Sequence, residues 1–77
     1  MFEIENRVGD ARPVHYDTHL YVGQPVVMSD RSTGLFGENG VISHLGYDPL
    51  LGETIRIELL NRLTEGSFFR TQFRLTD

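Results

Sequence analysis

The segment from Gly34 to Leu45 places the strongest constraint on how this chain can fold. Its glycines at positions 34, 37 and 40 are followed at once by the segment Val41–Leu45, which begins with two β-branched residues. Glycine readily adopts the backbone conformations of tight turns, whereas β-branched residues are enriched in strands. The segment therefore predicts a tight turn that feeds a strand, and Asn39-Gly40 is its strongest two-residue turn signal.

Short alternating segments recur along the chain between turns rich in glycine, proline and aspartate. The predicted strands are residues 2–5, 14–22, 26–29, 41–45, 54–60 and 67–75. A length of 77 residues leaves room for one domain only, here residues 1–77. Regularly spaced short strands of this kind predict an all-β fold, a small partly open barrel of about five antiparallel strands.

Residues 53–63 allow two interpretations. Ile55, Ile57 and Leu59 alternate with charged residues, as in a half-buried strand, but the same segment also fits helical spacing. We favour the strand because isoleucine is β-branched and the alternation is regular.

The predicted strand 54–60 can be paired with the predicted strand 67–75 in one preferred register. Placing Glu58 opposite Arg70 avoids the like-charge pair of Arg56 with Arg70 that the neighbouring register would create. The inner face of the last strand would then carry Phe69, Thr71, Phe73 and Leu75.

The composition excludes several classes of protein. The chain has no cysteine, so it has neither disulfides nor thiolate metal sites, and we expect a reducing, cytoplasmic compartment. Residues 1–6 do not resemble a signal peptide, and no apolar run is long enough to span a membrane.

The net charge of −4 disfavours nonspecific binding to nucleic acid. All seven basic residues are arginine. Arginine suits bidentate recognition, and codon bias in a GC-rich genome is the alternative explanation.

Residues 21–61 resemble the KOW-type pattern of SH3-like barrels. The similarity lies in Val22–Val27, in Gly37–Ile42 and in the following strand Ile55–Leu59. The resemblance implies an SH3-like barrel without enzymatic activity that binds RNA, DNA or protein within transcription and translation assemblies. KOW loops that touch nucleic acid are typically basic, whereas this loop carries Glu38, and so the resemblance favours the fold over a nucleic-acid role.

His15, Asp17 and His19 form the most suggestive chemical motif. On a strand their side chains would share one face at intervals of roughly 6.5–7 Å, and His44 could join them around a divalent metal. A solvated polar strand face explains the motif equally simply, so we assign no metal and no cofactor. The sequence also lacks a nucleophile elbow and a phosphate-binding loop, and we expect no enzymatic activity.

Apolar residues in predicted loops and arginines on a predicted strand face indicate a protein partner. We expect a small adaptor or regulator of a larger cytoplasmic complex, of a size that suits a phage- or plasmid-encoded protein. Nucleic-acid binding through the arginine and aromatic face and metal binding are the alternatives, and a homo-oligomer is compatible with the sequence.

The apolar residues in the predicted loops are Leu35, Phe36, Tyr47, Leu50 and Leu51. The predicted contact residues are Leu35, Phe36, Tyr47, Leu50, Arg56, Phe68, Arg70 and Arg74.

Overall fold

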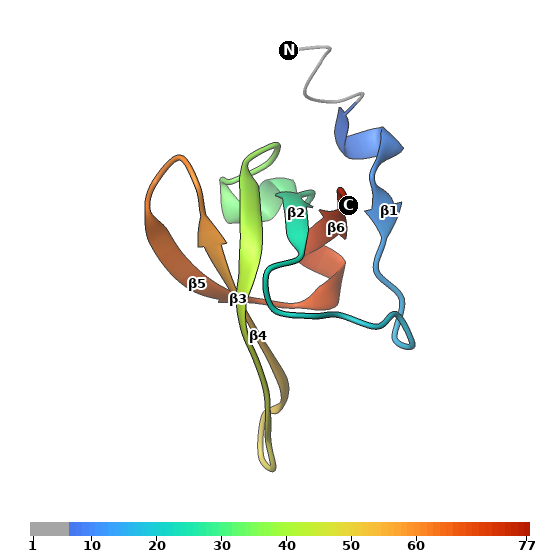
Figure 1. Ribbon diagram of the computed structural model, residues 1–77, viewed down its shortest axis with the longest axis vertical. Coiled ribbons are helices and arrows are strands. Elements are labelled where there is room, and N and C mark those ends of the chain that lie inside the picture. The colour runs from blue at the N-terminus through green and yellow to red at the C-terminus, as the bar shows by residue number, and fades with distance from the viewer. Residues whose placement is uncertain (1–6) are drawn as a thin grey trace.

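Six antiparallel strands form the protein in a computed structural model that describes residues 7–77 (Figure 1). They are β1 (Arg12–Pro13), β2 (Pro25–Met28), β3 (Asn39–Asp48), β4 (Gly52–Leu59), β5 (Thr64–Phe68) and β6 (Phe73–Leu75). Their order in the sheet is β1-β6-β2-β3-β4-β5, so the ends of the sheet remain unjoined. The predicted all-β, partly open barrel is confirmed, with six strands in place of about five.

The two longest strands, β3 and β4, are the framework of the barrel. Ile55, Ile57 and Leu59 of β4 are buried and alternate with exposed residues, so the strand interpretation of this segment is confirmed and the helical one is wrong. The pairing of β3 with β4 shifts between Ile42 and His44. An irregularity of this kind bends a strand, and here it lets β3 pair with β2 at one end and form a long hairpin with β4 at the other.

The core lies between the inner faces of β2, β3, β4 and β6. Its buried members are Leu20, Val26, Met28, Ile42, Ile55, Ile57, Leu59, Phe73 and Leu75. A second, smaller cluster joins Val8, Ala11 and Val27 on the other face of β2. The helical turn at residues 7–10 supplies Val8, and β2 is therefore buried on both faces.

The predicted strand at 14–22 is wrong, because this segment is a loop. Its polar groups bond one another: the backbone N–H of His15 donates to the hydroxyl of Thr18 (2.9 Å), and the N–H of Thr18 donates to the carbonyl of His15 (3.2 Å). Such local bonds compete with strand pairing. Only Arg12–Pro13 pairs with another strand, and the predicted strand at 2–5 lies outside the described residues.

The predicted continuous strand at 67–75 is also wrong. β5 ends at Phe68, the chain turns through the 3-10 helix η2 (Arg70–Gln72), and β6 then pairs with β2. The Gln72 side chain accepts a hydrogen bond from the N–H of Phe69 (2.8 Å), and the N–H of Gln72 donates to the carbonyl of Phe69 (2.9 Å). These two bonds hold the turn that sequence alternation alone does not reveal.

This break overturns the predicted register. Glu58 lies opposite Glu65, and Ile57 lies opposite Gly66, so Glu58 does not face Arg70. The predicted inner face is correct for Phe73 and Leu75, which are buried, and wrong for Phe69 and Thr71, which are exposed.

Gly40 lies within β3 and not in a turn, contrary to the Asn39-Gly40 prediction. The tight turn falls at Phe36 and Gly37, where Gly37 has a φ of 84°. Gly40 is needed for a different reason: a Cβ atom there would lie 2.7 Å from Ile57 Cγ2 and 2.8 Å from the Glu58 carbonyl oxygen. The strands thus approach too closely for any side chain at this position.

Candidate functional site

The β3–β4 hairpin extends past the rest of the barrel (Figure 1). β5 pairs with β4 only over residues 55–59, whereas β3 and β4 continue to pair as far as Asp48 opposite Gly52. The outer part of the hairpin is therefore a two-stranded projection.

The tip of this hairpin is a three-residue turn with defined hydrogen bonds. The Asp48 carboxylate accepts hydrogen bonds from the backbone N–H groups of Leu50 (2.7 Å) and Leu51 (3.0 Å). Gly52 closes the turn with a φ of 85°, a conformation that glycine adopts without strain. Both leucines of this hydrogen-bonded turn are exposed.

Four large apolar side chains are exposed on and beside this projection. The exposed fractions are 77% for Tyr47, 94% for Leu50, 80% for Leu51 and 72% for Phe69. Leu51 and Phe69 also line a groove of about 300 Å³ that Ile55 and Phe68 border from the barrel. We call Tyr47, Leu50, Leu51, Phe69 and this groove the hairpin surface.

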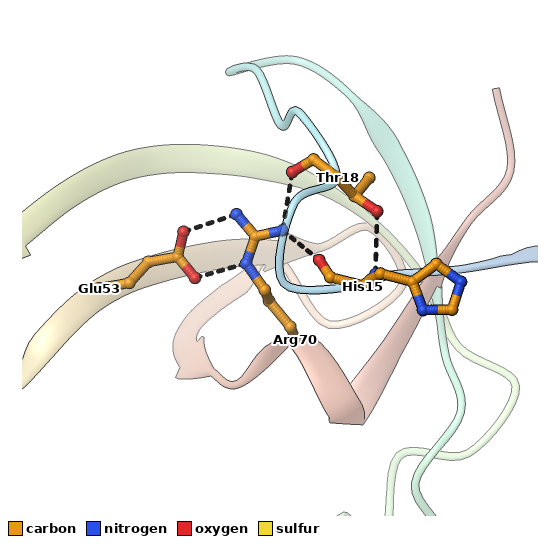
Figure 2. A network of polar contacts seen from close by, with 4 residues as sticks. All are labelled: His15, Thr18, Glu53 and Arg70. Atoms are coloured by element: carbon orange, nitrogen blue, oxygen red, sulfur yellow. Dashed lines mark hydrogen bonds and ion pairs between the residues drawn. The ribbon is translucent and has the colours of Figure 1, made fainter.

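Arg70 ties the outer part of the hairpin, at Glu53, to the loop before β2 (Figure 2). Its Nε and Nη2 donate to the two carboxylate oxygens of Glu53 at 2.7 and 2.8 Å. Its Nη1 donates to the backbone carbonyls of His15 and Thr18, both at 2.7 Å. One guanidinium therefore joins β4, η2 and the 15–18 loop, and it holds the hairpin in place.

The same hydrogen bonds shift the titration of the pair. Donation from Arg70 lowers the pKa of the Glu53 carboxyl below its usual value, and partial burial opposes this shift. Acceptance by Glu53 raises the pKa of Arg70. Both groups are therefore more firmly charged in the folded protein than in the unfolded chain.

We expect the stabilisation from this pair to disappear in acid. Because the folded pKa of Glu53 lies below the unfolded one, its contribution is present above the ordinary glutamate pKa of about 4.5 and is lost as the pH falls through the folded pKa. Urea unfolding between pH 7 and pH 3 should show a smaller acid-induced loss for Glu53→Gln than for the unaltered chain. Arg70→Gln should show the same smaller acid-induced loss of stability as Glu53→Gln, since each breaks the same pair. If both variants lose as much stability between pH 7 and pH 3 as the unaltered chain does, the assignment is wrong.

The structure separates the apolar residues predicted as contacts. Tyr47 and Leu50 belong to the hairpin surface, and Phe68 borders its groove while it packs against the core. Leu35 is partly buried against the core, and Phe36 packs on the smaller cluster under the Arg31 guanidinium, whose carbon lies 3.9 Å from the ring centre.

The predicted common face of Arg56, Arg70 and Arg74 is wrong. Arg56 lies on β4 and Arg74 on β6, and these strands are separated in the sheet by β2 and β3. Arg56 pairs with Glu65 at 2.7 Å, and Arg70 is bound by Glu53. The arginine and aromatic face on which the nucleic-acid alternative depends is therefore not formed.

The fold does not place the residues of the histidine motif on one face of a strand. Residues 14–22 form a loop, so the regular spacing of His15, Asp17 and His19 along one face is lost. Within residues 7–77, no three histidine, cysteine, aspartate or glutamate side chains are grouped so that they could hold a metal ion.

Phe69 is the member of the hairpin surface that sequence reasoning missed. Strict alternation through 67–75 assigns it to the core, whereas the turn at η2 leaves it exposed beside Leu51. Adjacent residues of a strand point to opposite faces, so Phe68 and Phe69 cannot both lie in the core. This adjacent pair was the signal in the sequence that one of the two phenylalanines is exposed.

Comparison of the chain with family models, curated proteins and solved structures finds no match. The resemblance to KOW-type barrels accordingly stays a prediction. In the part of the chain that the structure describes, no helix is long and apolar enough to cross a membrane.

Proposed function

We propose that the protein is a non-enzymatic protein-binding module, an adaptor or regulator of a larger cytoplasmic complex, that contacts its partner through the hairpin surface. The observation that carries the proposal is the exposure of Tyr47, Leu50 and Leu51 on one ordered projection, next to Phe69. Exposed apolar side chains gathered on one part of a small protein mark interaction sites.

The geometry of the hairpin favours a protein partner. The Asp48 turn and the Arg70 bonds hold the backbone in place, so little conformational entropy is lost when a partner binds. The groove beside Leu51 has about 300 Å³ and can receive a side chain of the partner. Interfaces of high affinity are commonly built from such a pocket and a few apolar or aromatic anchors.

The groove offers little support for catalysis. Among residues 7–77, Glu53 is the single titratable residue that lines it, and both of its carboxylate oxygens accept hydrogen bonds from Arg70. A general acid or base needs a proton that it can exchange with substrate, and this pair holds the carboxylate ionised. Binding is therefore the function that this surface supports best.

The experiment that tests the proposal places a photo-crosslinking amino acid at Leu50 in cells of the source organism. Leu63 is the matched control, because it is a leucine with 85% exposure in the turn between β4 and β5. We expect a protein adduct from position 50 and not from position 63. Equal adducts from both positions, or adducts with nucleic acid, would contradict the proposal.

Once a partner is identified, Leu50→Asp should weaken its binding by about 30-fold, because a charge would enter an apolar interface at a cost of roughly 2 kcal/mol. Leu63→Asp should change the affinity less than about twofold, as expected for a side chain outside the interface. Titration calorimetry with the purified partner measures both. Equal affinities for the two variants would show that the partner binds elsewhere.

A further inference from the structure

The outer part of β3 pairs with another strand on one side only. The segment that leads into β2 reaches β3 as far as Ile42, whose N–H donates to the Gln24 carbonyl (3.0 Å) and whose carbonyl accepts from the Gly23 N–H (2.7 Å). From Ser43 to Asp48, β3 pairs with β4 alone in the part of the chain that the structure describes. The outer hairpin is therefore a two-stranded ribbon with an open edge along β3 (Figure 1).

The hydrogen-bond pattern identifies the backbone groups that face this open edge. The N–H of Leu60 donates to the carbonyl of Asn39 (3.1 Å), so every second residue of β4, counted back from Leu60, points its backbone groups at β3. These are the even-numbered residues of β4, and past the irregularity in β3 they lie opposite even-numbered residues of β3. The N–H and C=O groups of Leu45 and Tyr47 therefore point away from β4, as the groups of an edge that can receive another strand do.

One register allows two copies of this edge to pair with each other. Placing Leu45 opposite Leu45 would run the hairpin turn against Ile42, where the chain before β2 already occupies the edge. Placing Tyr47 opposite Tyr47 would set Leu45 against Pro49, which has no N–H to donate. Placing Leu45 opposite Tyr47 avoids both conflicts and puts a two-fold axis at Gly46, with two backbone hydrogen bonds in each of the two equivalent pairs.

This register places the ring of Tyr47 beside an existing pocket of the second copy. Opposed residues of an antiparallel pair lie on the same face of the sheet. Leu45 packs against the core, and the Tyr47 ring, which is 77% exposed in the single chain, would lie next to Leu45 of the other copy. An open pocket of about 340 Å³ is found there, between Leu45, Gly46 and the loop at residues 16–20. The pairing thus covers an apolar ring that the single chain leaves in water.

The other face of the paired hairpins brings two complementary polar side chains together. His44 of one copy lies opposite Asp48 of the other, and the His44 side chain is exposed. Within residues 7–77, both hydrogen bonds that Asp48 accepts end on Oδ1, so Oδ2 can accept one from the imidazole. Each feature of the edge is therefore matched by another feature of the same edge, which favours a second copy over an unrelated strand.

We propose that the protein forms a two-fold symmetric dimer in which the β3 edges of two hairpins pair antiparallel, with Leu45 of each copy opposite Tyr47 of the other. A two-stranded ribbon is marginally stable in water, and this pairing joins two ribbons into one sheet. The dimer goes beyond the proposed function and does not rest on it. The groove of the hairpin surface is lined by residues of β4 and β5, so it remains open at the opposite edge.

Sedimentation equilibrium of the full chain over a wide range of concentration tests the dimer. We expect the mass to rise from one chain to two. Tyr47→Pro should weaken dimerisation at least about tenfold, because each dimer loses two backbone hydrogen bonds and both tyrosine rings. Ser67→Pro is the matched control, because Ser67 lies opposite Arg56 on β5 and its N–H points to the open edge of that strand. This control should change dimerisation less than about twofold.

Amide hydrogen exchange on the unaltered protein provides a readout that needs no variant, and it decides the matter if Tyr47→Pro fails to fold. Exchange at Leu45 and Tyr47 should slow as the protein concentration rises, because their N–H groups become bonded in the dimer. Exchange at Glu53 and Ser67, whose N–H groups point to the open edges of β4 and β5, should not depend on concentration.

Three results would overturn the proposal. They are a chain that stays monomeric at every concentration, equal effects of Tyr47→Pro and Ser67→Pro, and protection at Glu53 or Ser67 in place of Leu45 and Tyr47. Phe69→Asp should dimerise as the unaltered chain does, since Phe69 lines the groove at the other edge of the hairpin. Loss of a protein partner in that variant would concern the hairpin surface alone, so the two proposals fail separately.

Discussion

Replacement of Arg70 by glutamine is expected to lower the free energy of unfolding by about 2 kcal/mol and the melting temperature by roughly 8 to 16 °C. The variant loses two hydrogen bonds to Glu53 and two to the carbonyls of His15 and Thr18. The ion pair alone would contribute less, since Glu53 is 41% exposed and water screens it. The larger part of the effect comes from carbonyls that lose a charged donor. Thermal and urea unfolding followed by circular dichroism measure the change.

Arg62→Gln is the matched control for this prediction. Arg62 makes a similar two-pronged contact with Glu38, with Nε at 2.9 Å from both carboxylate oxygens, but its side chain is 55% exposed. We expect a loss of at most about 1 kcal/mol, as for other exposed pairs. Amide hydrogen exchange at Thr18 should accelerate in Arg70→Gln and not in Arg62→Gln. Equal losses of stability in the two variants would show that the 15–18 loop does not depend on Arg70.

Replacement of Gly40 by alanine is expected to cost about 3 kcal/mol, enough to unfold much of a domain this small. The added Cβ would lie 2.8 Å from the carbonyl oxygen of Glu58, a backbone atom that cannot move without a shift of β4. The other close atom, Ile57 Cγ2 at 2.7 Å, belongs to a fully buried core side chain. Urea unfolding measures the difference.

Gly9→Ala is the control for the glycine prediction. A Cβ at Gly9 meets no atom within 4 Å, and the residue lies in the helical turn at 7–10. Its stability should stay within about 0.5 kcal/mol of the unaltered chain or rise slightly, since alanine favours helix more than glycine does. A tolerated Gly40→Ala would mean that β3 and β4 are farther apart than the structure places them.

Local patterns correctly predicted the strands that can be recognised from consecutive residues alone, whichever strand lies beside them. The alternation of Ile55, Ile57 and Leu59 identified β4, and the apolar run at Val26–Met28 identified β2. Phe73 and Leu75 were correctly placed in the core. In each case the inner face follows from the two-residue period of a strand, which is a property of consecutive residues.

The same reasoning failed where a distant contact competes with the local pattern. Residues 14–22 alternate like a strand, yet their carbonyls bond Arg70, which lies 55 residues from His15 and 52 from Thr18. Residues 67–75 alternate as well, yet the chain breaks at Arg70–Gln72 so that β6 can pair with β2. The candidate site was affected accordingly: Tyr47 and Leu50 were identified, Phe69 was missed, and the arginines were placed on a face that does not form.

The sequence by itself determined that this chain forms a small antiparallel barrel, because short alternating segments between turns can bury their apolar faces in few other ways. Only the tertiary structure decided which strands are neighbours, why Gly40 must be glycine and which arginines are neutralised. These features depend on distances between segments far apart in the chain, and such distances are set by how all the strands pack together.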